Sequence, residues 1–389
     1  MYKLKRLFVY VHVFFCMLAA KAASVFLRKS ARYKDLWIVS ERGIDARDNG
    51  YHFFKYLTSA HPEINAVYII TRKSPDYKKV AALGKTVSYG SFRHYLCFVM
   101  AKVKISTHID GYSPDILFFH KFRKLFPDRA KKVFLQHGII KDDLAFCHAD
   151  QTDVDLFICS AVPEYDFIQK TFGYPEGVLQ LTGLCRYDSL KKPAQPTKKL
   201  LLMPTWRSTL RTCTKAQFAA SDYCRRFSSL LNSPKLAELL AQYGCELIFY
   251  PHYEVQRFLD CFRTDCPNIK IVGFGAGDVQ DLLINTDILI TDYSSVFFDY
   301  AYMRKPIVYY PFDEQAFRRD HYKTGYFDER RDGFGAVAET EDELIEAIRH
   351  VLENDLQPDP IYLDRINAFF SFSDQENCKR NYEAILRLL

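Results

Sequence analysis

The stretch DILITDYSSVFFDYAYMRKPIVYY (287–310) decides the fold of this chain. It opens with an apolar, β-branched run, passes through Tyr293-Ser294-Ser295 into a segment with helical spacing, and continues after Pro306 as a second apolar run. A strand, a helix and a second strand in this order form a βαβ unit with two parallel strands. The stretch therefore predicts a parallel sheet that is covered by helices.

The same alternation extends along the chain on both sides of this unit. Further short apolar runs lie at 36–40, 66–70, 103–107, 132–136, 155–160, 199–204, 245–250 and 269–273. The segment KKPAQPTK (191–198) contains two prolines and no large apolar residue, which is typical of a linker. We predict an α/β protein with two Rossmann-like domains that face a cleft, at 36–190 and 199–360, followed by C-terminal helices at 361–389.

Composition and charge narrow the possible partners. The chain has 389 residues, of which 48% are hydrophobic and 26% charged, as in an ordered globular protein. Residues 1–34 contain eight lysines and arginines and no acid, which leaves 45 basic and 47 acidic residues in the remainder. A nearly neutral body gives no reason to expect nucleic-acid binding, which depends on clustered cations. The basic character belongs to the N-terminus.

Residues 1–35 are predicted to associate with a membrane. The apolar run 7–20 lies between basic flanks, and as a helix it would rise about 21 Å, less than the roughly 30 Å hydrocarbon core. This favours shallow or re-entrant insertion. Three alternatives remain: a span that extends to Leu27 and includes Lys21, a signal peptide cleaved near Ala20-Lys21-Ala22, or a buried helix of the first domain.

Polar residues follow three of the predicted strands, where ligands of parallel sheets bind. His137-Gly138 follows 132–136, and an imidazole at this place suits general base catalysis, with Gly138 permitting a close turn. Arg207 follows 199–204 and offers a fork of donors to phosphate, whereas His252 follows 245–250 and could donate to a phosphate or a leaving group. The alternatives are histidines that cap strands and a surface arginine.

The turn inside the decisive stretch is a candidate phosphate site. Ser294 and Ser295 precede the predicted helix, whose free backbone N–H groups together with the serine hydroxyls can bind an anion. The alternative is an ordinary N-cap. Asp299 could accept a hydrogen bond from a ribose, or it could be a solvated helix acid. The sequence has no C-x-x-C or H-E-x-x-H motif, and we expect no metal site.

Several of these motifs together resemble a known family. The run 288–313, with LQHGI (135–139), PTWR (204–207), PHY (251–253) and TGLCRYDSL (182–190), is similar to the CDP-glycerol glycerophosphotransferase family, the teichoic acid primases and polymerases. Two further matches are ARDNGYHFFKYL (46–57) and GYFDERRDGFGAV (325–337). The resemblance covers most of residues 36–389.

The resemblance implies a GT-B fold and a peripheral or monotopic enzyme on the cytoplasmic face of the bacterial cell membrane. Such enzymes build teichoic acid or capsule polymers. They move a polyol phosphate, here expected to be glycerol phosphate, from a CDP-activated donor to a hydroxyl of a lipid-linked or polymer acceptor, and they release CMP. The implied partners are this donor, this acceptor and the membrane surface, with no nucleic acid and no cofactor.

The resemblance also implies roles for particular residues. His137 is expected to be the general base, and His252 to lie at the donor diphosphate. The other expected positions are phosphate-facing Thr205, Arg207, Ser294 and Ser295, ribose-facing Asp299, and Gly138 and Arg186 on the acceptor side.

One departure and two alternatives stay open. The chain reads Ile139-Ile140-Lys141-Asp142-Asp143 where the family often has a proline and paired lysines, which leaves the acceptor undefined. The alternative functions are a GT-B sugar transferase or nucleotide-sugar epimerase, and a non-catalytic membrane-surface scaffold.

Overall fold

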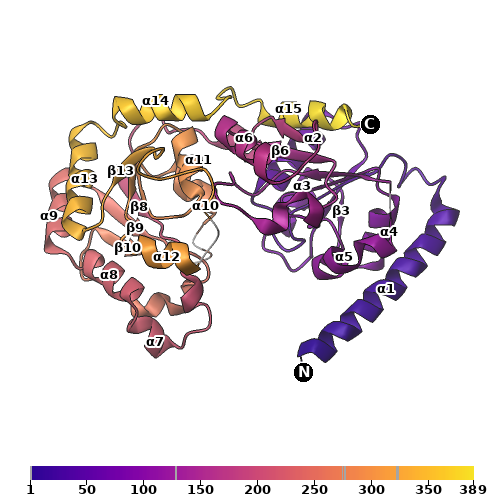
Figure 1. Cartoon of the computed structure of the whole chain (residues 1–389), viewed down its shortest axis with the longest axis horizontal. Coiled ribbons are helices and arrows are strands. Elements are labelled where there is room, and N and C mark those ends of the chain that lie inside the picture. The colour runs from indigo at the N-terminus through magenta and orange to yellow at the C-terminus, as the bar shows by residue number, and fades with distance from the viewer. Residues whose placement is uncertain (1, 128, 274, 276, 321–323) are drawn as a thin grey trace. The chain divides into compact units, whose positions relative to one another are not determined.

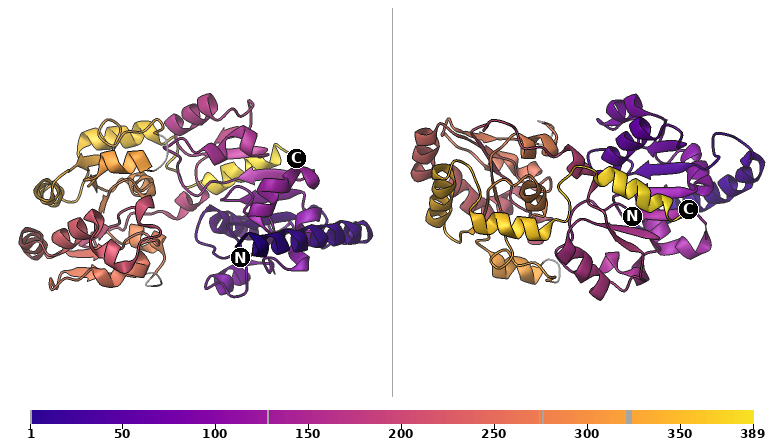
Figure 2. Two further views of the ribbon diagram at one scale, coloured as in Figure 1. Left: turned by 60° about the horizontal axis from the view of Figure 1, so that its bottom comes forward. Right: turned by 90° about the horizontal axis from the view of Figure 1, so that it is seen from above.

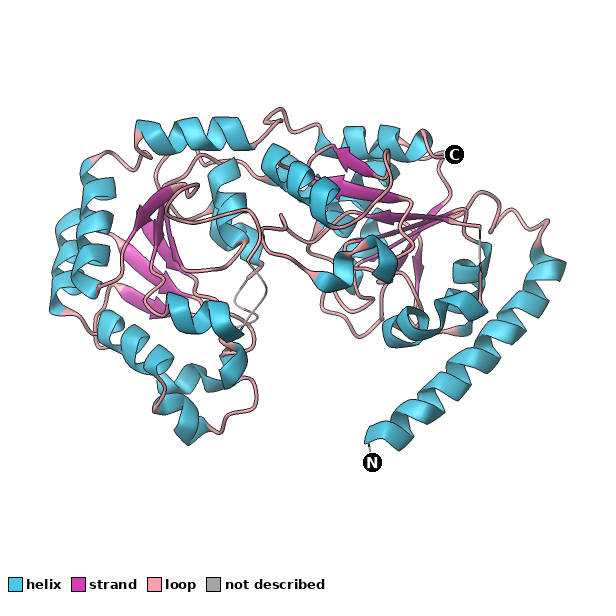
Figure 3. Ribbon diagram, viewed as in Figure 1, coloured by secondary structure: helices cyan, strands magenta, loops and turns pink. Residues whose placement is uncertain are grey.

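The chain folds into two compact units, each built around one parallel sheet (Figures 1 and 3). The computed structural model describes residues 2–127, 129–273, 275, 277–320 and 324–389. Unit 1 comprises Met1–Ile139, Ala145–Ser189 and Ser371–Leu389, and unit 2 comprises Ile140–Leu144 and Leu190–Phe370. The prediction of an α/β fold with two parallel sheets is confirmed.

Unit 1 contains a seven-stranded sheet in the order β3-β2-β1-β4-β5-β6-β7. The strands are β1 (Trp37–Ser40), β2 (Ala66–Ile69), β3 (Thr86–Val87), β4 (Val103–Ser106), β5 (Lys131–Phe134), β6 (Leu156–Cys159) and β7 (Leu179–Leu181). Every pairing in this sheet is parallel, so all carboxyl ends lie along one edge.

Helices cover both faces of this sheet. They are α1 (Tyr2–Leu27), α2 (Asn49–Ala60), α3 (Tyr77–Leu83), α4 (Phe92–Met100), α5 (Ile116–Phe122), α6 (Val162–Thr171) and α15 (Asn377–Leu386). Short 3₁₀ turns lie between them: η1 (Arg123–Leu125), η2 (Ala145–Cys147), η3 (Ala149–Gln151) and η4 (Cys185–Ser189). Successive strand residues point to opposite faces, so Val39 packs with α2 and α15, whereas Ile38 packs with α1 and α4.

Helix α1 lies along unit 1 as one continuous helix (Figures 1 and 2). One face buries Val13, Met17 and Ala20 in the cluster that includes α4. The opposite face is apolar and exposed, with Phe8 69% and Phe15 62% accessible. By length and composition alone, Leu4–Leu27 could also cross a membrane. The helix is thus longer than the apolar run 7–20, and it is partly rather than fully buried.

Unit 2 contains a six-stranded parallel sheet in the order β10-β9-β8-β11-β12-β13. The strands are β8 (Lys199–Leu202), β9 (Glu246–Phe249), β10 (Ile269–Ile271), β11 (Ile288–Thr291), β12 (Ile307–Tyr309) and β13 (Gly335–Val337). The stretch 287–310 forms β11, α11 (Val296–Tyr302) and β12, as predicted, with Ile290 paired to Val308.

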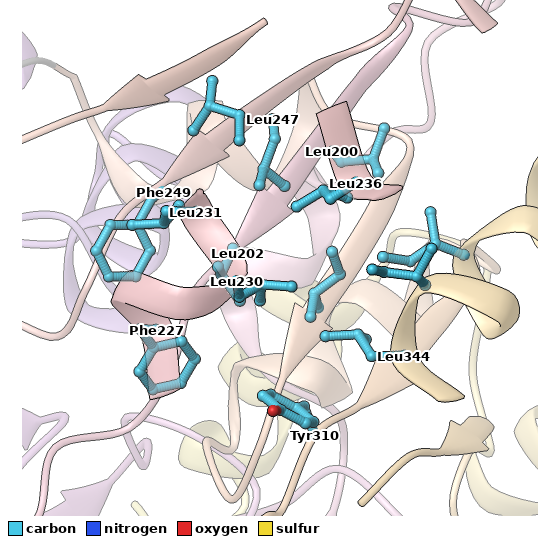
Figure 4. Close-up of a cluster of buried hydrophobic side chains, with 14 of the residues drawn as sticks. Leu200, Leu202, Phe227, Leu230, Leu231, Leu236, Leu247, Phe249, Tyr310 and Leu344 are labelled. Atoms are coloured by element: carbon cyan, nitrogen blue, oxygen red, sulfur yellow. The ribbon is translucent and has the colours of Figure 1, made fainter. Parts of the chain in front are cut away.

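The remaining elements of unit 2 are helical. They are α7 (Lys215–Ala219), α8 (Asp222–Leu231), α9 (Pro234–Tyr243), α10 (Val279–Ile284), α12 (Glu314–Asp320), α13 (Glu341–Glu353), α14 (Pro360–Phe369), η5 (Ser208–Leu210) and η6 (Gln256–Cys261). Leucines of β8 and β9 pack against Phe227 and Leu230 of α8 in the core (Figure 4). This core holds the carboxyl ends of β8, β9 and β11 in fixed register.

Candidate active site

His137 lies on a sharp turn at the carboxyl edge of the first sheet. Two residues after β5, Gln136 has a positive φ of 59° and turns the chain. Its side-chain amide donates to the carbonyl of Ile158 and, over 3.1 Å, to Glu164 Oε1, which are both buried. The left-handed residue of this turn is therefore Gln136, while Gly138 itself is buried. Gln136 leaves the side chain of His137 exposed to solvent.

Two side chains from distant segments hold this turn. Asn49, the first residue of α2, donates from Nδ2 to the carbonyl of Gln136 over 2.7 Å. Arg186 of η4 donates from Nη1 to the carbonyl of His137 over 2.9 Å, and its backbone N–H donates to Asn49 Oδ1 over 2.9 Å. The turn is thus fixed from both α2 and η4.

Asp48 completes the clamp on the turn. Its Oδ1 accepts from the backbone N–H of Asn49 and from Arg186 Nη1, each over 2.7 Å. The same guanidinium nitrogen therefore bridges Asp48 and the backbone of His137. Sequence reasoning assigned Arg186 to the acceptor side but missed Asp48 and Asn49. The signal was present, because both lie in the ARDNG run that carries part of the family resemblance.

The electrostatic surroundings of His137 favour a neutral imidazole. Desolvation lowers its pKa below the usual 6.5, the carboxylate of Asp48 acts in the opposite direction, and Arg186 lowers it again. The ring is still reached by solvent, which moderates the desolvation. The backbone of Thr107 also acts to raise the pKa. In a neutral imidazole, one ring nitrogen can accept a proton.

Glu41, immediately after β1, holds the segment that contains Asp48 and Asn49. Its buried carboxyl accepts from the backbone N–H groups of Arg47, Asp48 and Tyr51 over 2.9–3.0 Å. Burial, and next the nearby Asp48, raise the pKa of Glu41 to about 8. This carboxyl ties the segment before α2 to the end of β1.

His252 lies at the carboxyl edge of the second sheet, three residues after β9. Its Nδ1 accepts from the backbone N–H of Glu254 over 3.3 Å, and the ring of Trp206 stacks beside it at 6.1 Å between centroids. Desolvation lowers its pKa to about 4. His252 is therefore neutral at neutral pH, and with Nδ1 as acceptor its Nε2 carries the proton and can donate.

Arg207 occupies a different environment from the one expected. It is only 6% exposed, and it donates from Nε and Nη2 to the two carboxylate oxygens of Asp313 over 2.7 and 2.9 Å. Nη2 also lies 2.9 Å from Asp292, and Nη1 donates to the carbonyl of Thr205 over 2.7 Å. The carboxylates raise its pKa against the effect of burial. The structure thus shows Arg207 holding the loop after β8, and its contact with phosphate stays a prediction.

Three other predicted residues surround the turns after β8 and β11. Thr205 donates its backbone N–H to Asp292 over 2.7 Å, and its buried Oγ1 has no partner in the described part of the chain. Ser294 Oγ accepts from the N–H of Val296 over 3.4 Å. Ser295, at the N-cap position of α11, is exposed, and its side chain makes no capping hydrogen bond.

The structure groups the predicted residues by unit. His137, Gly138 and Arg186 lie together in unit 1. Thr205, Arg207, His252, Ser294 and Ser295 follow neighbouring strands of unit 2. Asp299 lies within α11 and is only 4% exposed, and its ribose contact stays a prediction. Among the described residues, no group of three or more His, Cys, Asp or Glu side chains is arranged to hold a metal ion.

Comparison with protein families gives one match over nearly the whole chain. The family model described as CDP-Glycerol:Poly(glycerophosphate) glycerophosphotransferase matches residues 21–387. The minor teichoic acid biosynthesis protein GgaB of Bacillus subtilis is 32% identical over 369 residues, which cover 91% of this chain. The teichoic acid poly(glycerol phosphate) polymerase of Bacillus spizizenii is 31% identical over 242 residues, or 60% of the chain. The matched regions span 40% and 56% of the lengths of these two relatives.

Solved structures share the fold. The wall teichoic acid polymerase TagF superposes with a TM-score of 0.67 at 16% identity, covering 97% of this chain and all of the compared TagF chain. A putative UDP-N-acetylglucosamine 2-epimerase from Listeria monocytogenes superposes with a TM-score of 0.54 at 12% identity, covering 90% and 95% of the two chains. At these identities, the two likenesses establish a common GT-B-like architecture.

Proposed function

The chain belongs to the CDP-Glycerol:Poly(glycerophosphate) glycerophosphotransferase family, and from this premise we propose that it transfers a polyol phosphate from a CDP-activated donor to a hydroxyl acceptor. Glycerol phosphate is the proposed unit, and the acceptor is a lipid-linked or cell-surface polymer. One observation carries the proposal: His137 is a solvent-exposed imidazole at the carboxyl edge of the first sheet, on a turn whose backbone Asn49 and Arg186 hold in place. A TagF variant has been solved after a soak with CDPG, which supports a donor of this type.

The proposed reaction is a direct phosphoryl transfer. The acceptor oxygen attacks the phosphorus that bears the polyol, a new P–O bond forms, and His137 takes the hydroxyl proton. The bond from that phosphorus to the bridging oxygen breaks, and CMP leaves with the electron pair. Such a transfer needs alignment and charge stabilisation more than covalent catalysis, and no cofactor takes part in this proposal.

His252 is proposed to act at the donor. With Nδ1 occupied by the N–H of Glu254, the neutral ring presents Nε2–H as a hydrogen-bond donor. Such a donor can stabilise charge that develops on a phosphate oxygen or on the leaving CMP. Thr205 Oγ1, Ser294 and Ser295 are proposed to supply further donors from the neighbouring turns.

Helix α1 is proposed to lie on the cytoplasmic membrane surface rather than to cross it. Val13, Met17 and Ala20 face the protein, and Tyr10 packs against Phe118 and Phe122 near α5. Lipid cannot surround a helix that is packed in this way. The exposed apolar face and its cation-rich flanks suit shallow insertion among anionic headgroups.

CMP release tests the transferase. Purified protein is assayed with CDP-glycerol, CDP-ribitol and sugar nucleotides, with and without a membrane lipid acceptor. We expect acceptor-dependent CMP from a CDP-polyol, reduced by roughly 10²–10⁴-fold in His137→Ala. His148→Ala is the matched control, because that ring stacks on Phe172 in the same unit. Turnover with sugar nucleotides alone would identify a sugar-nucleotide enzyme, and no turnover with any pair would favour the scaffold.

Vesicle flotation tests whether the exposed face of α1 binds a membrane surface. Phe8→Ser with Phe15→Ser is expected to lower binding to vesicles that contain phosphatidylglycerol, because these two side chains supply exposed apolar area. Ile361→Ser on α14 removes a comparably exposed apolar side chain elsewhere and should leave binding unchanged. Equal binding by the double variant and the wild type would contradict the proposed orientation of α1.

A further inference from the structure

The turn after β4 lies beside the turn that carries His137. Strands β4 and β5 are parallel neighbours, with Ser106 paired to Phe134. Thr107 and His108 follow β4, and His137 follows β5 by three residues. Both turns therefore leave the same edge of the sheet.

The imidazole of His108 stacks on the imidazole of His137. The ring centroids are 4.8 Å apart, and the ring planes differ by 11°. This separation lies in the range of offset-stacked aromatic pairs. Desolvation is the largest cause that lowers the pKa of each of the two histidines, so both rings are neutral at neutral pH and no like charge opposes the stack.

Local hydrogen bonds fix the position of the His108 ring. Its Nδ1 lies 3.0 Å from Thr107 Oγ1, and its backbone N–H donates to Ser106 Oγ over 3.1 Å. The carbonyl of His108 accepts from the N–H of Gly111 over 2.9 Å. Thr107 thus contacts the ring, and Ser106 and Gly111 hold the backbone of His108.

The turn itself is anchored to the end of β1. Ser106 Oγ donates to the carbonyl of Glu41 over 3.0 Å. A Cβ at Gly111 would lie 2.2 Å from that carbonyl oxygen and 2.3 Å from Ser106 Oγ, so only glycine fits here. Close packing of this kind leaves little freedom for the His108 ring to shift.

The turn after β4 therefore contacts His137 through the ring of His108, which covers one face of the His137 imidazole. A ring stacked on this face restricts rotation of the His137 imidazole about its Cβ–Cγ bond.

We propose that His108 is a positioning residue for His137, whose stacked ring holds the imidazole in one orientation, so that one ring nitrogen stays free to take the acceptor proton. This inference rests on the proposed function of His137. Misplacement of a catalytic group by about 1 Å costs on the order of 10²-fold in rate. We expect the loss in kcat rather than in the KM for the donor, because His108 belongs to unit 1 and the residues proposed to bind the donor belong to unit 2.

Two substitutions separate stacking from polar contact. His108→Ala is expected to lower kcat by about 10–100-fold, with the KM for the CDP-polyol changed less than about twofold. His108→Phe keeps an aromatic face and should recover most of kcat. Wild-type kcat in His108→Ala would overturn the proposal, and so would equal losses in the alanine and phenylalanine variants. His148→Ala is again the matched control.

A second readout does not depend on turnover. In ¹⁵N spectra of imidazole groups, we expect the wild-type His137 to show one neutral tautomer, identified by its loss in His137→Ala. His108→Ala should give averaged ¹⁵N shifts from mixed tautomers, and His108→Phe should keep the wild-type pattern. An unchanged pattern in His108→Ala would overturn the inference. If the wild-type protein released no CMP, the proposed function would fail, and the spectra would still decide whether His108 positions His137.

Discussion

At the residue scale, the basicity of His137 results from opposing influences within unit 1. Desolvation and Arg186 lower its pKa, whereas Asp48 raises it. The free base is the active form, so kcat/KM falls as the pH drops through this pKa. Because the pKa lies below 6.5, we expect the acidic limb of the profile below pH 6.5.

Replacing Asp48 tests this balance. Asp48→Asn keeps a polar N-cap for α2 but removes the negative charge that favours the protonated imidazole. The acidic limb of kcat/KM should therefore move to lower pH, measured by CMP release at a series of pH values. Asp153→Asn, which removes an exposed partner of Lys132, should leave the limb in place. A limb that stays in place or moves to higher pH in Asp48→Asn would contradict this account.

Arg207 gives a second prediction at this scale. Lysine keeps the charge but cannot reproduce the fork that Asp313 accepts, and each lost charged hydrogen bond costs about 1.5–3 kcal/mol. Arg207→Lys should lower the melting temperature while affinity for CDP, measured by calorimetry, stays within about threefold. Arg225→Lys, at an exposed position of α8, should change neither quantity. Wild-type stability with at least tenfold weaker CDP binding would instead support direct contact with phosphate.

At the element scale, α1 has two apolar faces with different roles. Met17 is buried against unit 1, whereas Leu7 is 56% exposed. Met17→Ala should lower the free energy of unfolding of unit 1 by about 2–5 kcal/mol, because it leaves a cavity. Leu7→Ala should stay within about 0.5 kcal/mol. Thermal melts of the lipid-free protein check this, and equal shifts for both variants would contradict the packing of α1.

The short edge strands show where local sequence signals weaken. All ten predicted apolar runs contain strands, but β3, β7 and β13 were missed. These three lie at sheet edges and have only two or three residues each. So short a run has no recognisable alternation, and its pairing partner alone makes it a strand.

At the scale of the whole molecule, the chain returns to unit 1 at its end. The helices predicted at 361–389 after the second domain divide between the two units, with α14 in unit 2 and α15 in unit 1. The N–H groups of Asn377 and Cys378 donate to Asp188 over 2.8 Å each. Since Asp188 belongs to the same 3₁₀ turn as Arg186, α15 supports the clamp on His137.

Removal of this segment tests its role. A protein ending at Phe370 should lose the thermal transition of unit 1 or show it at a lower temperature, because Tyr382 and Ile385 leave the core of unit 1. Unit 2 should still bind CDP in calorimetry, since its core lacks α15. An unchanged melt of unit 1 in the shortened protein would show that α15 is dispensable.

The sequence by itself determined the two α/β halves and the turns that carry His137, His252, Ser294 and Ser295. Those features depend on short-range patterns: apolar β-branched runs, helical spacing, and polar residues directly after a strand. Only the tertiary structure decided which side chains contact one another. Asp48 and Arg186 are 138 residues apart in sequence. His108 and His137 follow two neighbouring strands and stack on each other, and Arg207 contacts carboxylates from two other loops. Such pairs form when the sheet brings distant strand ends to one edge, which no local pattern records.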